Sequence, residues 1–161
     1  MKLTLNREYA LRHLFVTLLM TCLGGWFGYD GFVRYPATPA AELYRSIEGG
    51  DAPAGLDLEA FKEQKTKTQY GFTILSLLAA LVVGSRLYQA HAFSFEFDDE
   101  GFVYRGRRRS YAAIKQIDRS AWVKRGILRV DGIVLDSWPH IGVKEFERKL
   151  REAEAREAAS R

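Results

Sequence analysis

The sequence predicts an α+β membrane protein, in which two transmembrane helices carry a small cytoplasmic antiparallel β domain closed by a C-terminal helix. The apolar residues are concentrated in two blocks, each about as long as one membrane span. After the second block the hydrophobic pattern changes from helical to alternating, and it ends in an amphipathic helical pattern. The predicted parts are residues 1–35 (N-terminal segment and first transmembrane helix), 36–69 (extracytoplasmic helical loop), 70–91 (second transmembrane helix) and 92–161 (cytoplasmic domain).

The composition excludes several classes of protein. With 47% hydrophobic and 13% aromatic residues, the 161-residue chain is not intrinsically disordered. Its single cysteine, Cys22, excludes a disulfide scaffold. Cys22 and three widely spaced histidines (His13, His91 and His140) do not form a zinc-binding pattern, so no metal and no cofactor is expected.

The first transmembrane helix is predicted from Leu11 to Val33. Its central part, Leu14–Tyr29, contains no charged residue, and Arg12, Asp30 and Arg34 lie near its ends. This length satisfies the requirement of about 20 mostly apolar residues for a span. A cleaved signal peptide is disfavoured, because the basic N-terminal region is long and no small-x-small cleavage site closely follows the apolar run. A lipoprotein signal at Leu19-Met20-Thr21-Cys22 is also disfavoured, because threonine is a poor residue before the modified cysteine.

The second transmembrane helix is predicted from Tyr70 to Ala90. Arg86 is the only charged residue in this range, and from there its side chain can extend to the membrane interface. The alternative is a pair of buried helices in a soluble all-α protein. That alternative is disfavoured, because an 18.3 kDa fold cannot cover helices that are apolar on all sides.

The distribution of basic residues predicts the orientation. Lys2, Arg7 and Arg12 precede the first span, the loop Gly31–Gln69 has slightly more acidic than basic residues, and the part after Arg86 is rich in arginine and lysine. By the positive-inside rule, both termini are cytoplasmic in a bacterial inner membrane and the loop is outside. The net charge of +4 is attributed to this bias, and nucleic acid is not expected as a partner.

Small residues recur every three or four positions in both spans, which lets helix backbones approach closely in lipid. An intramolecular antiparallel hairpin is favoured over pairing with a foreign helix, although the same residues could serve either use. In such a hairpin Gly24 lies near Ser76, and Thr17 lies near Gly84. The predicted helix-packing residues are Gly24, Gly28, Ser76, Ala80 and Gly84.

The outer loop is predicted to hold one short helix after Thr38-Pro39, ended by Gly49-Gly50. A second helix begins near Leu56 and runs continuously into the second span.

The cytoplasmic part has the pattern of short strands and turns. Phe93, Phe95 and Phe97 alternate with polar residues, and Asp131-Gly132 is a dipeptide that favours a tight hairpin turn. The expected elements are strands over 93–97, 102–105, 121–130 and 133–138, a basic connection over 105–109, a strand or helical turn over 111–118, and a helix over 143–160.

Four stretches carry a resemblance to a known family: DDEGFVYRG, YAAIKQID, WVKRGILRV and IVLDSW followed by the terminal helix. Their order resembles that of the small bacterial pleckstrin-homology-like domains, which often follow a pair of membrane helices. The resemblance implies a non-catalytic platform for proteins or lipids.

Two groups of residues are candidate binding sites. The basic connection (Arg105, Arg107, Arg108 and Arg109) could bind anionic lipid, or it could be a solvated strand connection. Trp122 and Trp138 could form an exposed patch for a partner, although a position covering the core beneath the helix is favoured. His140 is expected in a loop, and Asp30 and Arg86 are expected to be interfacial anchors.

No catalytic constellation is recognised, so the chain is not expected to be an enzyme. The function expected is that of a non-catalytic accessory or assembly subunit of a larger membrane protein complex, with membrane lipids and complex subunits as partners. The alternative is an anionic-lipid-binding regulatory membrane protein.

Overall fold

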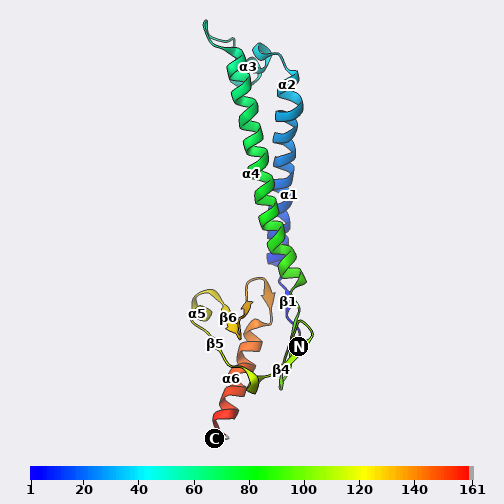
Figure 1. Cartoon of the computed structure of the whole chain (residues 1–161), viewed down its shortest axis with the longest axis vertical. Helices are drawn as coiled ribbons and strands as arrows, with labels where there is room; N and C mark the ends of the chain where they lie inside the picture. The colour runs from blue at the N-terminus through cyan, green and yellow to red at the C-terminus, as the bar shows by residue number, and fades with distance from the viewer. Residues whose placement is uncertain (160–161) are drawn as a thin grey trace. The chain divides into compact units, whose positions relative to one another are not determined.

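The computed structural model describes residues 1–159 and has an α+β architecture (Figure 1). Two long helical segments pack together, and small antiparallel sheets with a C-terminal helix form the remainder. The chain divides into two compact units. The helical unit contains residues 13–85, and the β unit contains residues 1–12 together with the chain from residue 86 onward.

The first long helical segment is continuous over three elements: α1 (Arg7–Tyr29), the π-helical turn η1 (Asp30–Arg34) and α2 (Tyr35–Ala37). It ends where Thr38 adopts an extended conformation (ψ 132°). Thr38 precedes a proline, and a residue before proline is restricted to extended conformations.

The second long segment is α4 (Leu58–Ala92), which is uninterrupted over 35 residues. The stretches Arg7–Ala37 and Leu58–Ala92 are both long and apolar enough to cross a membrane. This criterion rests on length and composition alone, and core helices of soluble proteins and N-terminal signal sequences also meet it.

The loop between the long segments contains the expected short helix, α3 (Ala40–Glu48). Gly49 ends it in the left-handed conformation (φ 81°), which glycine adopts without steric cost. Leu43 is almost fully buried, and the Tyr44 ring lies 4.9 Å from the ring of Phe61 in α4. The helix is therefore packed against the first turns of α4.

In the described residues, the β unit contains three small antiparallel sheets, which together hold eight strands. In the first sheet the order is β2-β3-β4, in the second β5-β6-β7, and in the third β1 pairs with β8. The strands are β1 (Thr4–Leu5), β2 (Phe95–Phe97), β3 (Gly101–Tyr104), β4 (Arg107–Ser110), β5 (Ile117–Asp118), β6 (Ile127–Val130), β7 (Ile133–Asp136) and β8 (His140–Ile141). The helical elements are η2 (Tyr111–Ala113), α5 (Trp122–Arg125) and α6 (Val143–Ala159).

The first five residues of the chain form an extended segment between β2 and β8. The Leu3 amide donates to the Phe95 carbonyl at 2.9 Å, and the Phe97 amide donates to the Met1 carbonyl at 2.7 Å. Thr4 pairs with Ile141 on the other side. The sequence placed residues 1–35 in a separate N-terminal part, whereas the structure makes the first residues a strand of the β unit.

The core of the β unit lies between the sheets and α6. Phe95 and Phe102 stack at 5.2 Å, and both pack edge-on against Phe146 of α6. The apolar face expected on the terminal helix is confirmed, since Val143, Phe146 and Leu150 are at most 1% exposed. The expected last residue of this helix, Ser160, lies outside the described residues. Other core residues are Leu3, Phe97, Tyr111, Leu128, Val130, Ile133 and Leu135.

Two predicted elements of the β unit are wrong. The basic connection is a hairpin turn at Arg105-Gly106, with positive φ at both residues, followed by strand β4. Positive φ at two successive residues is the geometry of a tight primed turn, and it directs the following arginines back along β3. The start of the expected strand 121–130 is instead the helical turn α5, which Gly126 ends at φ 66°.

Candidate functional site

The interface between α1 and α4 is lined by small side chains. A Cβ added to Gly24 would lie 2.9 Å from Leu77 Cδ2 and 3.6 Å from Ser76 Cβ. At Gly28 it would lie 3.6 Å from Thr73 Cγ2, and at Gly84 it would lie 3.4 Å from Thr17 Cγ2. Ser76 and Ala80 are both buried at 8% exposure. Gly24, Gly28 and Gly84 thus face the partner helix of the same chain, and Ser76 lies against Gly24.

Two threonine hydroxyl groups at this interface donate within their own helices. The Thr17 hydroxyl donates to the His13 carbonyl, and the Thr73 hydroxyl donates to the Gln69 carbonyl, both at 2.8 Å. These are local side-chain-to-backbone bonds of one helical turn. These two bonds stay within one helix each and do not join α1 to α4.

Asp30, which was expected as an interfacial anchor, is buried. It is 6% exposed at the start of η1, and its carboxylate pairs with Arg34 at 3.4 Å. On α4, Gln69 Nε2 donates to the Tyr35 hydroxyl at 3.2 Å, while Gln69 Oε1 has no hydrogen-bond partner among the described residues. The π-helical turn η1 begins at this buried carboxylate, and turns of this kind occur frequently at functional sites.

The arginines of the basic stretch lie on and beside an edge strand, because β4 is the last strand of its sheet. Arg108 bridges Asp98 at 2.7 Å and Glu100 at 3.1 Å, and Arg109 pairs with Asp131 at 3.4 Å. Two of the four predicted lipid-binding arginines are thus opposed by carboxylates.

The guanidinium group of Arg105 lies over the Tyr104 ring, 5.3 Å from its centre. Among the described ion pairs, none joins Arg105 or Arg107 to a carboxylate. These two side chains are therefore the ones most available to an anion.

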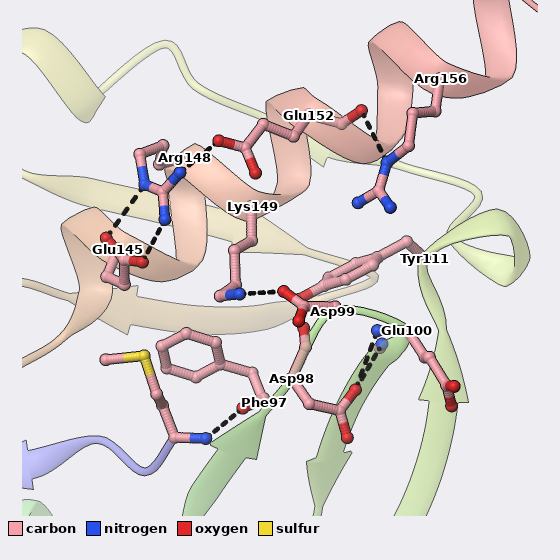
Figure 2. A network of polar contacts seen from close by, with 12 residues as sticks. Phe97, Asp98, Asp99, Glu100, Tyr111, Glu145, Arg148, Lys149, Glu152 and Arg156 are labelled. Carbon is pink, nitrogen blue, oxygen red and sulfur yellow. Dashed lines mark hydrogen bonds and ion pairs between the residues drawn. The ribbon is translucent and has the colours of Figure 1, made fainter.

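The turn before β3 is tied to α6 by a network of charged side chains. Figure 2 shows Lys149 of α6 directed toward Asp99, and Arg148 between Glu145 and Glu152 on the same helix. Asp98 accepts hydrogen bonds from the Glu100 and Gly101 amides, both at 3.0 Å. The carboxylates of this network are occupied by cations and backbone amides, so they hold the turn in place rather than offering a free base.

The contacts of this network and the burial of its side chains shift the pKa values of Asp98, Asp99 and Tyr111. The Glu100 amide, followed by the Arg108 guanidinium, lowers the pKa of Asp98 below its ordinary value, against a partial opposing effect of desolvation. The hydrogen bond from Lys149 lowers the pKa of Asp99. Burial raises the pKa of Tyr111 to about 12, and the Tyr111 hydroxyl donates to the Asp98 carbonyl at 2.8 Å.

A shallow groove of about 400 Å³ lies beside this network, between α6 and the segment that contains η2 and β5. Its lining combines apolar side chains such as Ile117 and Leu150 with the charged side chains of Glu154, Arg156 and Glu157. Glu154 pairs with Arg119 at 2.7 Å. Across residues 1–159 there is no group of three or more side chains that could hold a metal ion.

The two tryptophans do not form one patch. Trp122 packs against the core of the β unit, which is the position that the sequence favoured. For Trp138 the favoured position over the core is wrong, since Trp138 is 55% exposed and its ring meets the Tyr9 ring edge-on at 5.2 Å.

His140 is buried at 7% exposure in β8, which corrects its expected place in a loop. Its Nε2 lies 3.1 Å from the Ala90 carbonyl oxygen in the last turn of α4, and its ring lies 4.8 Å from the Phe93 ring. A carbonyl oxygen can only accept, so Nε2 carries the hydrogen and satisfies a carbonyl that the end of the helix leaves without a partner. The sequence showed no signal for this contact, which joins residues 50 positions apart.

No family model, no curated protein and no solved structure matches the chain. The resemblance to pleckstrin-homology-like domains therefore stays a prediction.

Proposed function

We propose that this chain is a membrane-anchored accessory or assembly subunit of a larger membrane protein complex, with no catalytic activity of its own. It resides in the bacterial inner membrane with both termini in the cytoplasm. It binds its partners through the outer faces of α1 and α4 and through the β unit.

The observation that carries this proposal is the distribution of side chains around the helical hairpin. The inner face is made of small residues, whereas large apolar side chains such as Phe15, Leu18, Leu75 and Leu81 are 56–68% exposed on the outer faces. Water does not favour so large an exposed apolar surface, whereas lipid and partner helices do.

The charge distribution supports the orientation. Exposed Arg7, Arg12 and Arg86 flank the ends of the helices that enter the β unit, whereas the opposite loop has no comparable excess of basic residues. By the positive-inside rule the β unit is then cytoplasmic.

The location is tested by labelling single cysteines with a membrane-impermeant maleimide. In a Cys22→Ser background, Ala54→Cys places a thiol in the exposed outer loop and Ser120→Cys places one on the exposed surface of the β unit. We expect intact spheroplasts to label only Ala54→Cys, and Ser120→Cys to require permeabilised membranes. Labelling of both in intact spheroplasts, or of Ser120→Cys alone, would contradict the proposed orientation.

The role is tested by purifying the tagged full chain from its native membrane in mild detergent at high salt, followed by mass spectrometry. We expect membrane proteins to co-purify at a fixed ratio. An unrelated two-helix membrane protein with the same tag is the control. Recovery of the chain alone would contradict the subunit role, even where the labelling result supports the location.

A further inference from the structure

Residues 138–141 expose two large apolar side chains on either side of a buried pair. Trp138 is 55% exposed and Ile141 is 57% exposed, whereas Pro139 and His140 between them are buried. The buried pair fixes the backbone of this segment, and the exposed pair projects from it.

The segment contacts the beginning of α1. Asn6 Nδ2 donates to the Trp138 carbonyl at 3.0 Å, and the Asn6 amide donates to the Pro139 carbonyl at 2.7 Å. Asn6 is itself the N-cap of α1, since its side-chain oxygen accepts from the Glu8 amide at 3.0 Å. The Tyr9 ring in the first turn meets the Trp138 ring.

The same segment contacts the end of α4, through the bond between His140 and the Ala90 carbonyl. Tyr9 comes two residues before the predicted first span, and Ala90 is the last residue of the predicted second span. Residues 138–141 therefore touch both helices at the level where each is predicted to leave the membrane.

The surroundings have the composition of a membrane interface. Tyr88 is 72% exposed in the last turns of α4, and Arg7 and Arg86 are exposed at the same helix ends, together with Arg12, which pairs with Glu8. Amphipathic aromatic rings are enriched at the headgroup level, and arginine binds phosphate groups through its guanidinium.

We propose that Trp138 and Ile141 insert into the headgroup region of the bilayer that α1 and α4 cross, so that this edge of the β unit is docked on phospholipid. This inference rests on the proposed membrane location. A phospholipid surface is favoured over a protein partner because the exposed pair is attached to both helix ends at the membrane boundary and is accompanied by basic side chains that suit phosphate.

The three tryptophans of the chain provide the test. Three single-tryptophan variants keep only Trp26, Trp122 or Trp138, with phenylalanine at the other two positions. Each full-length variant is reconstituted into vesicles of phosphatidylcholine and phosphatidylglycerol, with and without lipids brominated near the headgroup end of the acyl chain. Trp26, which is 68% exposed on α1, reports whether the helices are in the bilayer. Trp122, which packs against the core, is the matched control within the β unit.

We expect brominated lipid to quench the emission of Trp138 by about half, as for an indole at the headgroup level, and to leave Trp122 nearly unchanged. Quenching of Trp26 without quenching of Trp138 would overturn this inference and leave the membrane location standing. If neither Trp26 nor Trp138 is quenched, the membrane location fails as well. A blue-shifted but unquenched Trp138 would show that protein covers it, which also overturns the inference.

Discussion

Leu3 and Phe95 are neighbours in the β unit, although one precedes the helical hairpin and the other follows it. The Leu3 amide donates to the Phe95 carbonyl at 2.9 Å, and both side chains are buried in the same core. The β unit therefore needs chain from both sides of the hairpin to complete its core.

The first prediction tests this relationship. Leu3→Ala should lower the free energy of unfolding of the β unit by about 2–5 kcal/mol, because it removes a buried side chain and leaves a cavity. Thr4→Ala, at an exposed neighbouring position, is the control and should change little. Thermal unfolding in detergent, followed by tryptophan fluorescence, measures both. Equal stability of Leu3→Ala and the parent chain would show that the N-terminal segment is not part of the core.

The second prediction compares two adjacent glycines of α1. Gly24→Leu should destabilise the helical hairpin by about 1–3 kcal/mol through overpacking, because its Cβ already meets Leu77 at 2.9 Å. Gly25→Leu should be tolerated, because nothing lies within 4 Å of its Cβ.

The two glycine substitutions gain helix propensity equally, so their difference reports packing alone. In a Cys22→Ser background, the yield of disulfide between Thr17→Cys and Gly84→Cys measures the close approach of the helices. Equal loss of this cross-link in both leucine variants would contradict the packing described above.

The third prediction concerns Gly101, the first residue of β3. A Cβ there would lie 2.1 Å from the Arg109 carbonyl oxygen, which is backbone and cannot move without displacing β4. Gly101→Ala should therefore cost about 3 kcal/mol of stability, at the upper end of typical overpacking. Gly50→Ala, in open space, is the control. A chemical denaturation curve for each variant measures this loss of stability. If Gly101→Ala unfolds at the same denaturant midpoint as Gly50→Ala, the close contact between β3 and β4 is contradicted.

The fourth prediction is a pH dependence. The pKa of Asp98 is lower in the folded state than its ordinary value of 3.8, so its contribution to stability is present above that value and is lost as the pH falls through the folded pKa. The melting temperature of the β unit should therefore fall as the pH is lowered below about 4. Asp98→Asn should reduce this acid sensitivity and lower the melting temperature at pH 6. If the melting temperature of Asp98→Asn falls with pH as steeply as that of the parent chain, other carboxylates control the acid sensitivity.

Much of the fold could be predicted from local signals. The spacing of small residues in two apolar blocks predicted the pairing of Gly24 with Ser76 and of Thr17 with Gly84, and the structure places these pairs in contact. Asp131-Gly132 predicted the turn between β6 and β7, where both residues have positive φ. Periodicity and turn chemistry act within a few residues, so the chain displays them directly.

The remainder depends on contacts between distant parts of the chain. A two-residue strand such as β1 has too short a pattern to recognise, and it exists because its backbone pairs with β8. The run Arg107–Ser110 shows no alternation of apolar and polar residues. It is a strand because the turn at Arg105-Gly106 directs it back along β3. His140 is buried where its ring bonds to the Ala90 carbonyl. Trp122 packs against the core of the β unit, whereas Trp138 packs against the ring of Tyr9, and each of these contacts joins distant parts of the chain.

The N-terminal strand also changes the thermodynamics of the helical hairpin. Because residues on both sides of the hairpin are held in one folded unit, the intervening chain is a closed loop. Because the ends of the loop are already held together, α1 and α4 lose less conformational entropy when they pack than two free helices would. The loop that contains α3 already joins α1 to α4 at one end, and the β unit adds a second tie at the other end, which raises the effective concentration of the two helices, so that modest contacts among glycine, serine and alanine are sufficient. Unfolding of the β unit opens the loop, and the hairpin is then expected to loosen with it.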